Sequence, residues 1–228
     1  MPVKYFVWSF DDGVVQDRRI VEILREYGLG ATFHLNSGLF GAKTFIGHPP
    51  TVPHERLEVS EAKELYDGFE IAAHTCTHRD LSQCDDETRR REIADDVAAL
   101  SLLFDREITG FAYPYGRGAA ESREDLRAAG VAYARTVDES QDFRLPFDPL
   151  RLPITCRQND PAFFERMESF FRSESEADQL FLAFAHGYEF DYGTEHSNWD
   201  RFRRICETAA KQPNLTFCSI KEALRRTK

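Results

Sequence analysis

The chain alternates short apolar runs with stretches whose apolar residues recur every three or four positions. Tyr5–Phe10 is the first apolar run and predicts a strand, and Asp17–Tyr27 follows with the period of an amphipathic helix that ends at Gly28. Asp85–Phe104 gives the clearest helical pattern, with an acidic first turn and one apolar stripe. Further strands are predicted at 31–35, 69–73, 110–113, 132–137, 150–155, 181–185 and 215–218. Further helices are predicted at 60–67, 122–129 and 197–210, and two more helices are predicted to begin at residues 160 and 219.

This strand–helix alternation, repeated seven or eight times, predicts a parallel α/β fold. No long linker, low-complexity tract or internal repeat interrupts it, so we expect a single domain over residues 1–228. A barrel and an open doubly wound sheet both fit the pattern. The barrel is favoured because the polar clusters SFDDG, HTCTH, YPYGR and HGYE each follow the end of a predicted strand. In a (β/α) barrel these strand ends converge on the face that carries active sites.

Composition excludes some classes of partner. The formal net charge is −10, whereas nucleic acids and anionic membranes are bound by basic surfaces. A neutral small molecule or oligosaccharide is compatible with this charge. The longest wholly apolar stretch, Leu180–Ala185, is too short to span a bilayer. The amino terminus lacks the pattern of a secretory signal, so we expect a cytoplasmic location. Nothing in the pattern specifies an oligomeric state.

The cluster HTCTH suggests a metal site. His74 and His78 lie four residues apart and share one face if the loop turns helically, and two imidazoles on one face can chelate a transition metal. A third ligand from another segment, ideally a carboxylate, would leave an open coordination position for water. The alternative is a pair of ordinary loop histidines, one of which caps the next helix.

The cluster SFDDG contains the missing carboxylates. One of Asp11 and Asp12 can bind the metal, and the other can stay free beside the metal-bound water and accept its proton. The alternative is an Asp-Asp-Gly turn that caps the following helix.

Two later strand ends offer further catalytic groups. His186 follows the apolar run LFLAFA and is suited to protonate a departing amine near neutral pH. The turn Pro114–Gly116 can direct a backbone N–H at a developing oxyanion. Each has a structural alternative, a hydrogen-bonded histidine at a strand end and an ordinary proline-aromatic turn.

Three other features have both a functional and a structural interpretation. Glu189 can orient His186 or bind a sugar hydroxyl, or can be a solvated carboxylate. Trp199 can stack on a sugar ring, but a core anchor is favoured because Trp199 shares a helical stripe with Phe202 and Ile205. The proline-rich segment 37–57 is either a wall of the substrate site or plain surface.

In their order and spacing, SFDDG, HTCTH, FAYPYG and FLAFAH resemble the motifs of the polysaccharide deacetylases, the NodB-homology family also called carbohydrate esterase family 4. The resemblance extends from Ser9 to about His186. It implies a distorted (β/α)7 barrel and a metal-dependent hydrolase that removes N-acetyl groups from an amino sugar.

The resemblance also assigns residue roles. It implies that Asp11 is the general base, and that Asp12, His74 and His78 bind one divalent metal ion, usually zinc, with cobalt, nickel and manganese as alternatives. It implies that His186 is the general acid. It further implies that the backbone N–H of Tyr115 helps to stabilise the oxyanion and that Leu182 lines the acetyl pocket.

The chain departs from the family at two points. The third motif of the family often carries an arginine that orients the base aspartate, and here that position is Ala112. Arg117 and Arg151 are the candidates to replace it. The usual partner motif, an aspartate followed shortly by Asp-Trp, is also missing, and Asp138 and Asp142-Phe143 only loosely correspond to it.

These departures, with the absent export signal, favour a soluble oligosaccharide or an N-acetylated sugar precursor over a long polymer. Two rival functions stay open at this point. One is a metal-dependent C–N hydrolase of a small cyclic amide or ureide on the same fold, and the other is a non-catalytic carbohydrate-binding relative.

Overall fold

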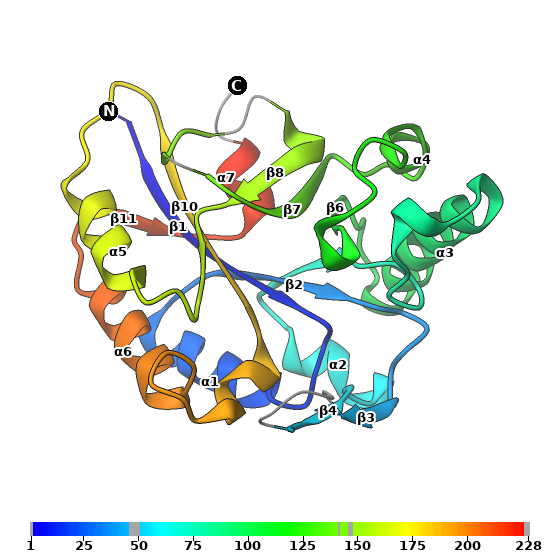
Figure 1. Ribbon diagram of the computed structural model, residues 1–228, viewed down its shortest axis with the longest axis horizontal. Helices are drawn as coiled ribbons and strands as arrows, with labels where there is room; N and C mark the ends of the chain where they lie inside the picture. Colours follow the sequence, from blue (N-terminus) through cyan, green and yellow to red (C-terminus); the bar gives the residue numbers. More distant parts are fainter. Residues whose placement is uncertain (1, 46–50, 141, 146–147, 226–228) are drawn as a thin grey trace.

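One largely parallel sheet forms the centre of the molecule (Figure 1). The computed structural model describes residues 2–45, 51–140, 142–145 and 148–225. The strands of this sheet are β1 (Lys4–Asp11), β2 (Ala31–Leu35), β5 (Glu70–Ala73), β6 (Gly110–Ala112), β7 (Tyr133–Glu139), β8 (Leu152–Ile154), β9 (Cys156–Arg157), β10 (Gln179–His186) and β11 (Leu215–Phe217). They lie in the order β8-β7-β6-β5-β2-β1-β10-β9, and β11 pairs with β1 beside this path.

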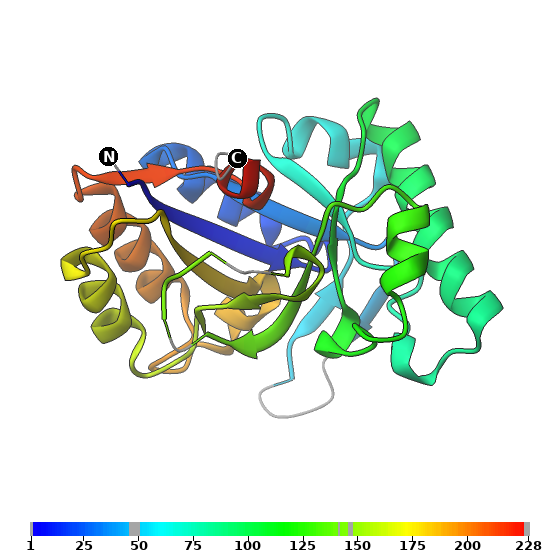
Figure 2. The ribbon, with the colours of Figure 1, turned by 90° about the horizontal axis from the view of Figure 1, so that it is seen from above.

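A bend between β8 and β9 nearly closes the sheet into a barrel. Only Thr155 separates the two strands, and β8 pairs with β7 while β9 pairs with β10. The Thr155 backbone N–H donates to the Leu182 carbonyl at 2.8 Å, and its hydroxyl accepts from the Leu182 N–H at 2.9 Å. Helices surround the barrel (Figure 2). This arrangement confirms the predicted distorted (β/α) barrel.

The helices follow the predicted pattern closely. They are α1 (Asp17–Tyr27), α2 (Val59–Leu65), α3 (Asp86–Phe104), α4 (Arg123–Ala128), α5 (Phe163–Arg172), α6 (Trp199–Ala210) and α7 (Ile220–Arg225). α5 begins later than predicted, since Asp160 accepts a hydrogen bond from the Ala162 N–H in the turn before it. None of the helices in the described ranges is both long enough and apolar enough to cross a membrane.

Two structural details differ from the predicted elements. Segment 150–155 was expected to be a strand throughout, but a 3-10 turn at Pro149–Arg151 delays the start of β8. Segment 37–57 contains a short antiparallel hairpin, β3 (Lys43–Phe45) and β4 (Pro53–Glu55). Positions 46–50 of this segment lie outside the described residues.

Alternation along the strands separates an inner core from an outer core. Tyr5, Val7 and Leu182 belong to the cluster inside the barrel, whereas Phe6 and Trp8 belong to the larger cluster between sheet and helices. Because side chains alternate between faces, the inward series of β1 continues to the polar residues at its carboxyl end. The strands therefore bury apolar side chains inside the barrel and place polar side chains at its mouth.

Candidate active site

A cavity of about 510 Å³ opens at the carboxyl ends of the barrel strands. Its lining includes six residues singled out from the sequence: Asp11, Asp12, His74, His78, Tyr115 and His186. They come from the ends of β1, β5, β6 and β10, as the barrel geometry predicts.

Asp12, His74 and His78 form a group that could hold a metal ion, with ligand atoms within 4.8 Å of one another. Asp12 Oδ1 lies 3.9 Å from His74 Nε2 and 3.6 Å from His78 Nε2. Ligand atoms bound to zinc at about 2.0–2.1 Å in a tetrahedral site are about 3.4 Å apart, so the two distances from Asp12 Oδ1 need only a small contraction. Asp12 Oδ1 is buried and accepts no hydrogen bond from the described residues. The donor set, with a carboxylate oxygen that accepts no hydrogen bond from the described residues, fits a divalent metal.

The backbone around the histidines is strained and firmly held. HTCTH forms a turn rather than a helix, and Thr75 and His78 adopt the left-handed conformation, with φ of 65° and 58°. Non-glycine residues seldom do so, and such strain concentrates at functional sites. The buried Asp96 of α3 accepts the His74 N–H at 2.8 Å, and the Asn36 amide donates to the His74 carbonyl. The loop is therefore fixed from two sides.

The histidines are held in the form that binds metals. Burial lowers the pKa of His74 to about 3, and burial also lowers the pKa of His78. His74 Nδ1 lies 2.8 Å from the Ala112 carbonyl, to which it donates, so its unprotonated Nε2 faces Asp12. Neutral imidazoles are required because a metal ion competes with a proton for the same nitrogen.

The β3–β4 hairpin covers one side of Asp12. His54 Nε2 lies 3.0 Å from Asp12 Oδ2, and Arg56 Nη1 lies 2.9 Å from Asp12 Oδ1 without hydrogen-bond alignment. Burial by itself raises the pKa of Asp12, but Arg56 and His54 hold that pKa well below its usual value. The carboxylate therefore stays ionised inside the protein.

Asp11 is held by an arginine that the sequence did not single out. The buried Arg135 guanidinium donates to both carboxylate oxygens of Asp11, and His34 Nδ1 lies 3.3 Å from Oδ1. Burial raises the pKa of Asp11, but Arg135, His74 and His34 together hold it well below the usual value. Asp11 Oδ2 is 3.6 Å from His74 Nε2, so this ionised carboxylate borders the metal-binding group.

Arg135 occupies the place next to the missing family arginine. Ala112 of β6 and Arg135 of β7 are register partners, so their side chains leave the sheet from neighbouring points on the same face. The two candidates named from the sequence lie elsewhere, since Arg117 pairs with Asp80 at 3.1 Å and Arg151 pairs with Asp138 at 3.2 Å. The guanidinium that contacts Asp11 therefore comes from β7, next to position 112 of β6.

His186 lies beside Asp11, because the two are register partners on β10 and β1. Its Nδ1 is 3.1 Å from Glu189 Oε1, and its backbone N–H donates to Glu189 Oε2 at 3.2 Å. Burial lowers the pKa of His186, but Glu189 outweighs it and raises the pKa to about 9. Asp11 and His186 are therefore adjacent, one ionised and the other protonated at neutral pH.

The remaining predicted residues lie at different distances from the cavity. Tyr115 lines it, with φ of 57° and its ring centroid 4.8 Å from that of His78. Leu182 belongs to the inner core, and Phe184, one inward position closer to the mouth, lines the cavity instead. Trp199 packs against Phe190, with ring centroids 5.1 Å apart, and does not line the cavity.

His34 and Arg135 contribute to the site and were missed by the sequence analysis. His54 and Arg56 lie in segment 37–57, which was offered as a possible wall of the site, and His54 lines the cavity. His34 comes near the end of a predicted strand, where the other site residues were found. Arg135 is a lone charge inside a predicted buried strand, which is rare unless the charge is paired. His54 and Arg56 had no such signal, since the hairpin that places them has little periodicity.

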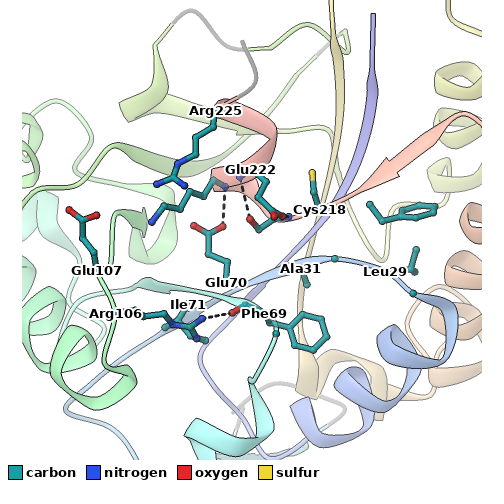
Figure 3. Close-up of a pocket in the computed structure, with 16 residues that line it drawn as sticks. Leu29, Ala31, Phe69, Glu70, Ile71, Arg106, Glu107, Cys218, Glu222 and Arg225 are labelled. Atoms are coloured by element: carbon teal, nitrogen blue, oxygen red, sulfur yellow. Dashed lines mark hydrogen bonds between the residues drawn. The ribbon is translucent and has the colours of Figure 1, made fainter. Parts of the chain in front are cut away.

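A second and larger cavity, of about 560 Å³, opens at the amino ends of β2 and β5 (Figure 3). Acidic and basic side chains are interleaved around it, among them Glu70, Arg106 and Glu222. Glu70 accepts hydrogen bonds from Thr32 and from the Lys221 N–H. This opposite end of the barrel carries none of the predicted site residues.

Comparisons with known proteins identify a matching family and similar folds. A family model described as polysaccharide deacetylase matches residues 1–134. A polysaccharide deacetylase structure from Mycobacterium smegmatis, described as putative, is 14% identical, with a TM-score of 0.67 over 99% of this chain and 90% of that one. A family 4 carbohydrate esterase from Streptomyces lividans, in complex with acetate, is 17% identical, with a TM-score of 0.59 over 92% and 90%.

The deacetylase PplD of Streptococcus pyogenes, also in complex with acetate, is 22% identical, with a TM-score of 0.53 over 64% of this chain. The chain spans 61% of the length of PplD. At these identities the likeness establishes the fold.

The group Asp12, His74 and His78, which could hold a metal ion, generates a direct prediction. His78→Ala removes one of three ligands, so we expect the purified variant to lose most of the divalent metal found in the wild type by elemental analysis. His186→Ala is the matched control, because His186 lines the same cavity but is outside the group, and it should keep the wild-type metal content. Full metal stoichiometry in His78→Ala would exclude this ligand assignment.

Proposed function

This chain belongs to the polysaccharide deacetylase family, and we propose that it removes N-acetyl groups from an amino-sugar-containing oligosaccharide or sugar precursor with the aid of one divalent metal ion, most simply zinc. We propose further that residues 1–228 act as one catalytic domain. The observation that carries the proposal is the meeting of Asp11, His186 and the Asp12-His74-His78 group around one cavity. Each of these groups has the protonation state that amide hydrolysis requires.

Asp12, His74 and His78 hold the metal in this proposal. When bound, the ion polarises the acetyl carbonyl and makes a nearby water more acidic. The rest of the chemistry falls to side chains of the barrel mouth.

Asp11 is the general base and accepts a proton from the attacking water. Its low pKa supports this role, because an ionised carboxylate is available throughout the neutral range. Arg135 is a positioning residue, since its two hydrogen bonds fix the plane of the carboxylate. Water attack on the acetyl carbon develops negative charge on the carbonyl oxygen, and we assign the Tyr115 backbone N–H to donate to it.

His186 is the general acid and transfers its Nε2 proton to the departing amine as the C–N bond breaks. Its raised pKa supports this role, because Glu189 contacts Nδ1 and favours the charged imidazolium. Glu189 therefore acts through His186 rather than on the sugar.

Acetate release with and without a chelator tests the function. Metal-replete protein should release acetate from N-acetylglucosamine oligomers, lose this activity on chelation, and regain it when zinc is returned. Activity that survives complete metal removal would contradict the metal requirement. Metal-loaded protein that hydrolyses a cyclic ureide but releases no acetate would contradict the substrate class.

The pair His186–Glu189 predicts a change in the pH dependence of turnover. A general acid works only when protonated, so the rate falls as pH rises through the pKa of His186. Glu189→Gln removes the negative charge that raises this pKa, so the alkaline limb of the kcat profile should move to lower pH by about 1–2 units. Metal content serves as the control and should not change. An unmoved alkaline limb would remove His186 from the role of acid.

A further inference from the structure

Arg157 forms part of the wall of the catalytic cavity. It ends β9 and is the register partner of Phe184 on β10, so both side chains leave the sheet on the same face. The guanidinium carbon lies 5.0 Å from the centroid of the Phe184 ring, and that ring lies 5.0 Å from the ring of His186. The Phe184 ring thus lies between the Arg157 guanidinium and His186, the proposed general acid.

The side-chain donors of Arg157 are not used by the described residues of the protein. Among the residues that the structure describes, its side chain forms no ion pair and donates no hydrogen bond, and its contact is with the Phe184 ring. Stacking occupies the flat face of a guanidinium and leaves the N–H groups at its edge available. The side chain is only partly buried, so these N–H groups can meet a ligand in the cavity.

The positive charge of Arg157 is not balanced by the other charged groups around the cavity. Arg135 offsets the charge of Asp11, and Arg56 offsets that of Asp12. Glu189 is paired with His186 behind the cavity. No carboxylate in the described part of the chain offsets Arg157, although the whole protein carries a formal charge of −10. A positive charge at the wall of a concave site attracts anions locally, whatever the net charge of the molecule.

We propose that the substrate of this site carries an anionic group, a carboxylate or a phosphate, near its acetamido group, and that Arg157 binds this anion. The inference rests on the proposed deacetylation and specifies its substrate class. The guanidinium fork matches either oxyanion with two parallel hydrogen bonds. A wholly neutral sugar polymer offers hydroxyl and carbonyl oxygens as acceptors, but no charged partner for the guanidinium.

The test compares three N-acetylglucosamine derivatives of equal length: unmodified, with a carboxyethyl ether on O3, and with a phosphate on O6. Acetate release should show kcat/KM about 10- to 100-fold higher for one of the two anionic compounds than for the neutral one. The preferred compound distinguishes carboxylate from phosphate. Arg157→Gln should abolish this preference, and Arg157→Lys should retain part of it.

Two further variants make the test specific. Arg157→Met keeps the aliphatic stem against Phe184 and serves as a second neutral variant should Arg157→Gln fold poorly. Arg204→Gln is the matched control, because Arg204 also stacks on a phenylalanine, 4.7 Å from the Phe164 ring, but lies on α6 outside the cavity lining. The preference for the anionic compound should persist in this control.

Equal kcat/KM values for neutral and anionic compounds, or a preference that survives in both neutral Arg157 variants, would overturn the inference. If none of the three compounds releases acetate from metal-replete wild type, the proposed function fails instead. Calorimetric binding of the same compounds to metal-free protein then decides the role of Arg157. Tighter binding of an anionic compound, lost in Arg157→Gln, supports it, and equal binding of all three overturns it.

Discussion

The buried ion pair between Asp11 and Arg135 is the interaction on which the rest of the site depends. The Arg135 side chain is 0% exposed and that of Asp11 is 4% exposed, so neither charge is stabilised by bulk water. Loss of one partner from such a pair leaves an uncompensated buried charge and typically costs about 3–5 kcal/mol. The pair also connects β7 to β1 across the barrel mouth. It keeps the Asp11 carboxylate ionised although this carboxylate is buried 3.6 Å from His74.

The same principle sets the other charges in the cavity. Burial alone would protonate the carboxylates and deprotonate the histidines, because each change removes a charge from a poorly solvated place. A specific partner reverses this tendency at Asp11, Asp12 and His186. His74 and His78 lack a partner strong enough to do so and stay neutral. The charge state of each group is therefore set by its neighbours rather than by its residue type. Asp11 and Asp12 are anionic, His74 and His78 are neutral, and His186 is cationic.

Local sequence was sufficient to predict the parts of the site that follow strand ends. Asp11, Asp12, His74 and His186 each follow an apolar run, and barrel topology brings such ends together whatever the details of packing. A lone charge in a buried strand indicated that Arg135 is paired, but the identity of its partner could not be predicted, because it depends on how β6, β7 and β1 are arranged. The hydrophobic pattern of a strand indicates which face each side chain takes. It does not identify which residue of the neighbouring strand lies opposite, and here that pairing is Ala112 with Arg135.

Fold and site therefore differ in how far the sequence defines them. The boundaries of α1 and β2 were predicted to the residue, because strong periodicity and end signals coincide there. The β3–β4 hairpin was missed, because its strands are short and largely exposed and so carry little hydrophobic pattern. His54 and Arg56 reach Asp12 from this hairpin, so the least predictable element supplies two of the partners of the proposed metal ligand.

The claim that Arg135 holds Asp11 is tested most directly by moving the arginine from β7 to position 112 of the neighbouring strand β6. The kcat for acetate release would be measured in wild type, Arg135→Ala, the double variant Arg135→Ala/Ala112→Arg, and the control Arg117→Ala, whose arginine pairs with Asp80 at the surface. We expect Arg135→Ala to lose about 100-fold in kcat through misplacement of the base, the double variant to regain part of that loss, and Arg117→Ala to match wild type. Wild-type kcat in Arg135→Ala would contradict the claim that this ion pair holds the general base.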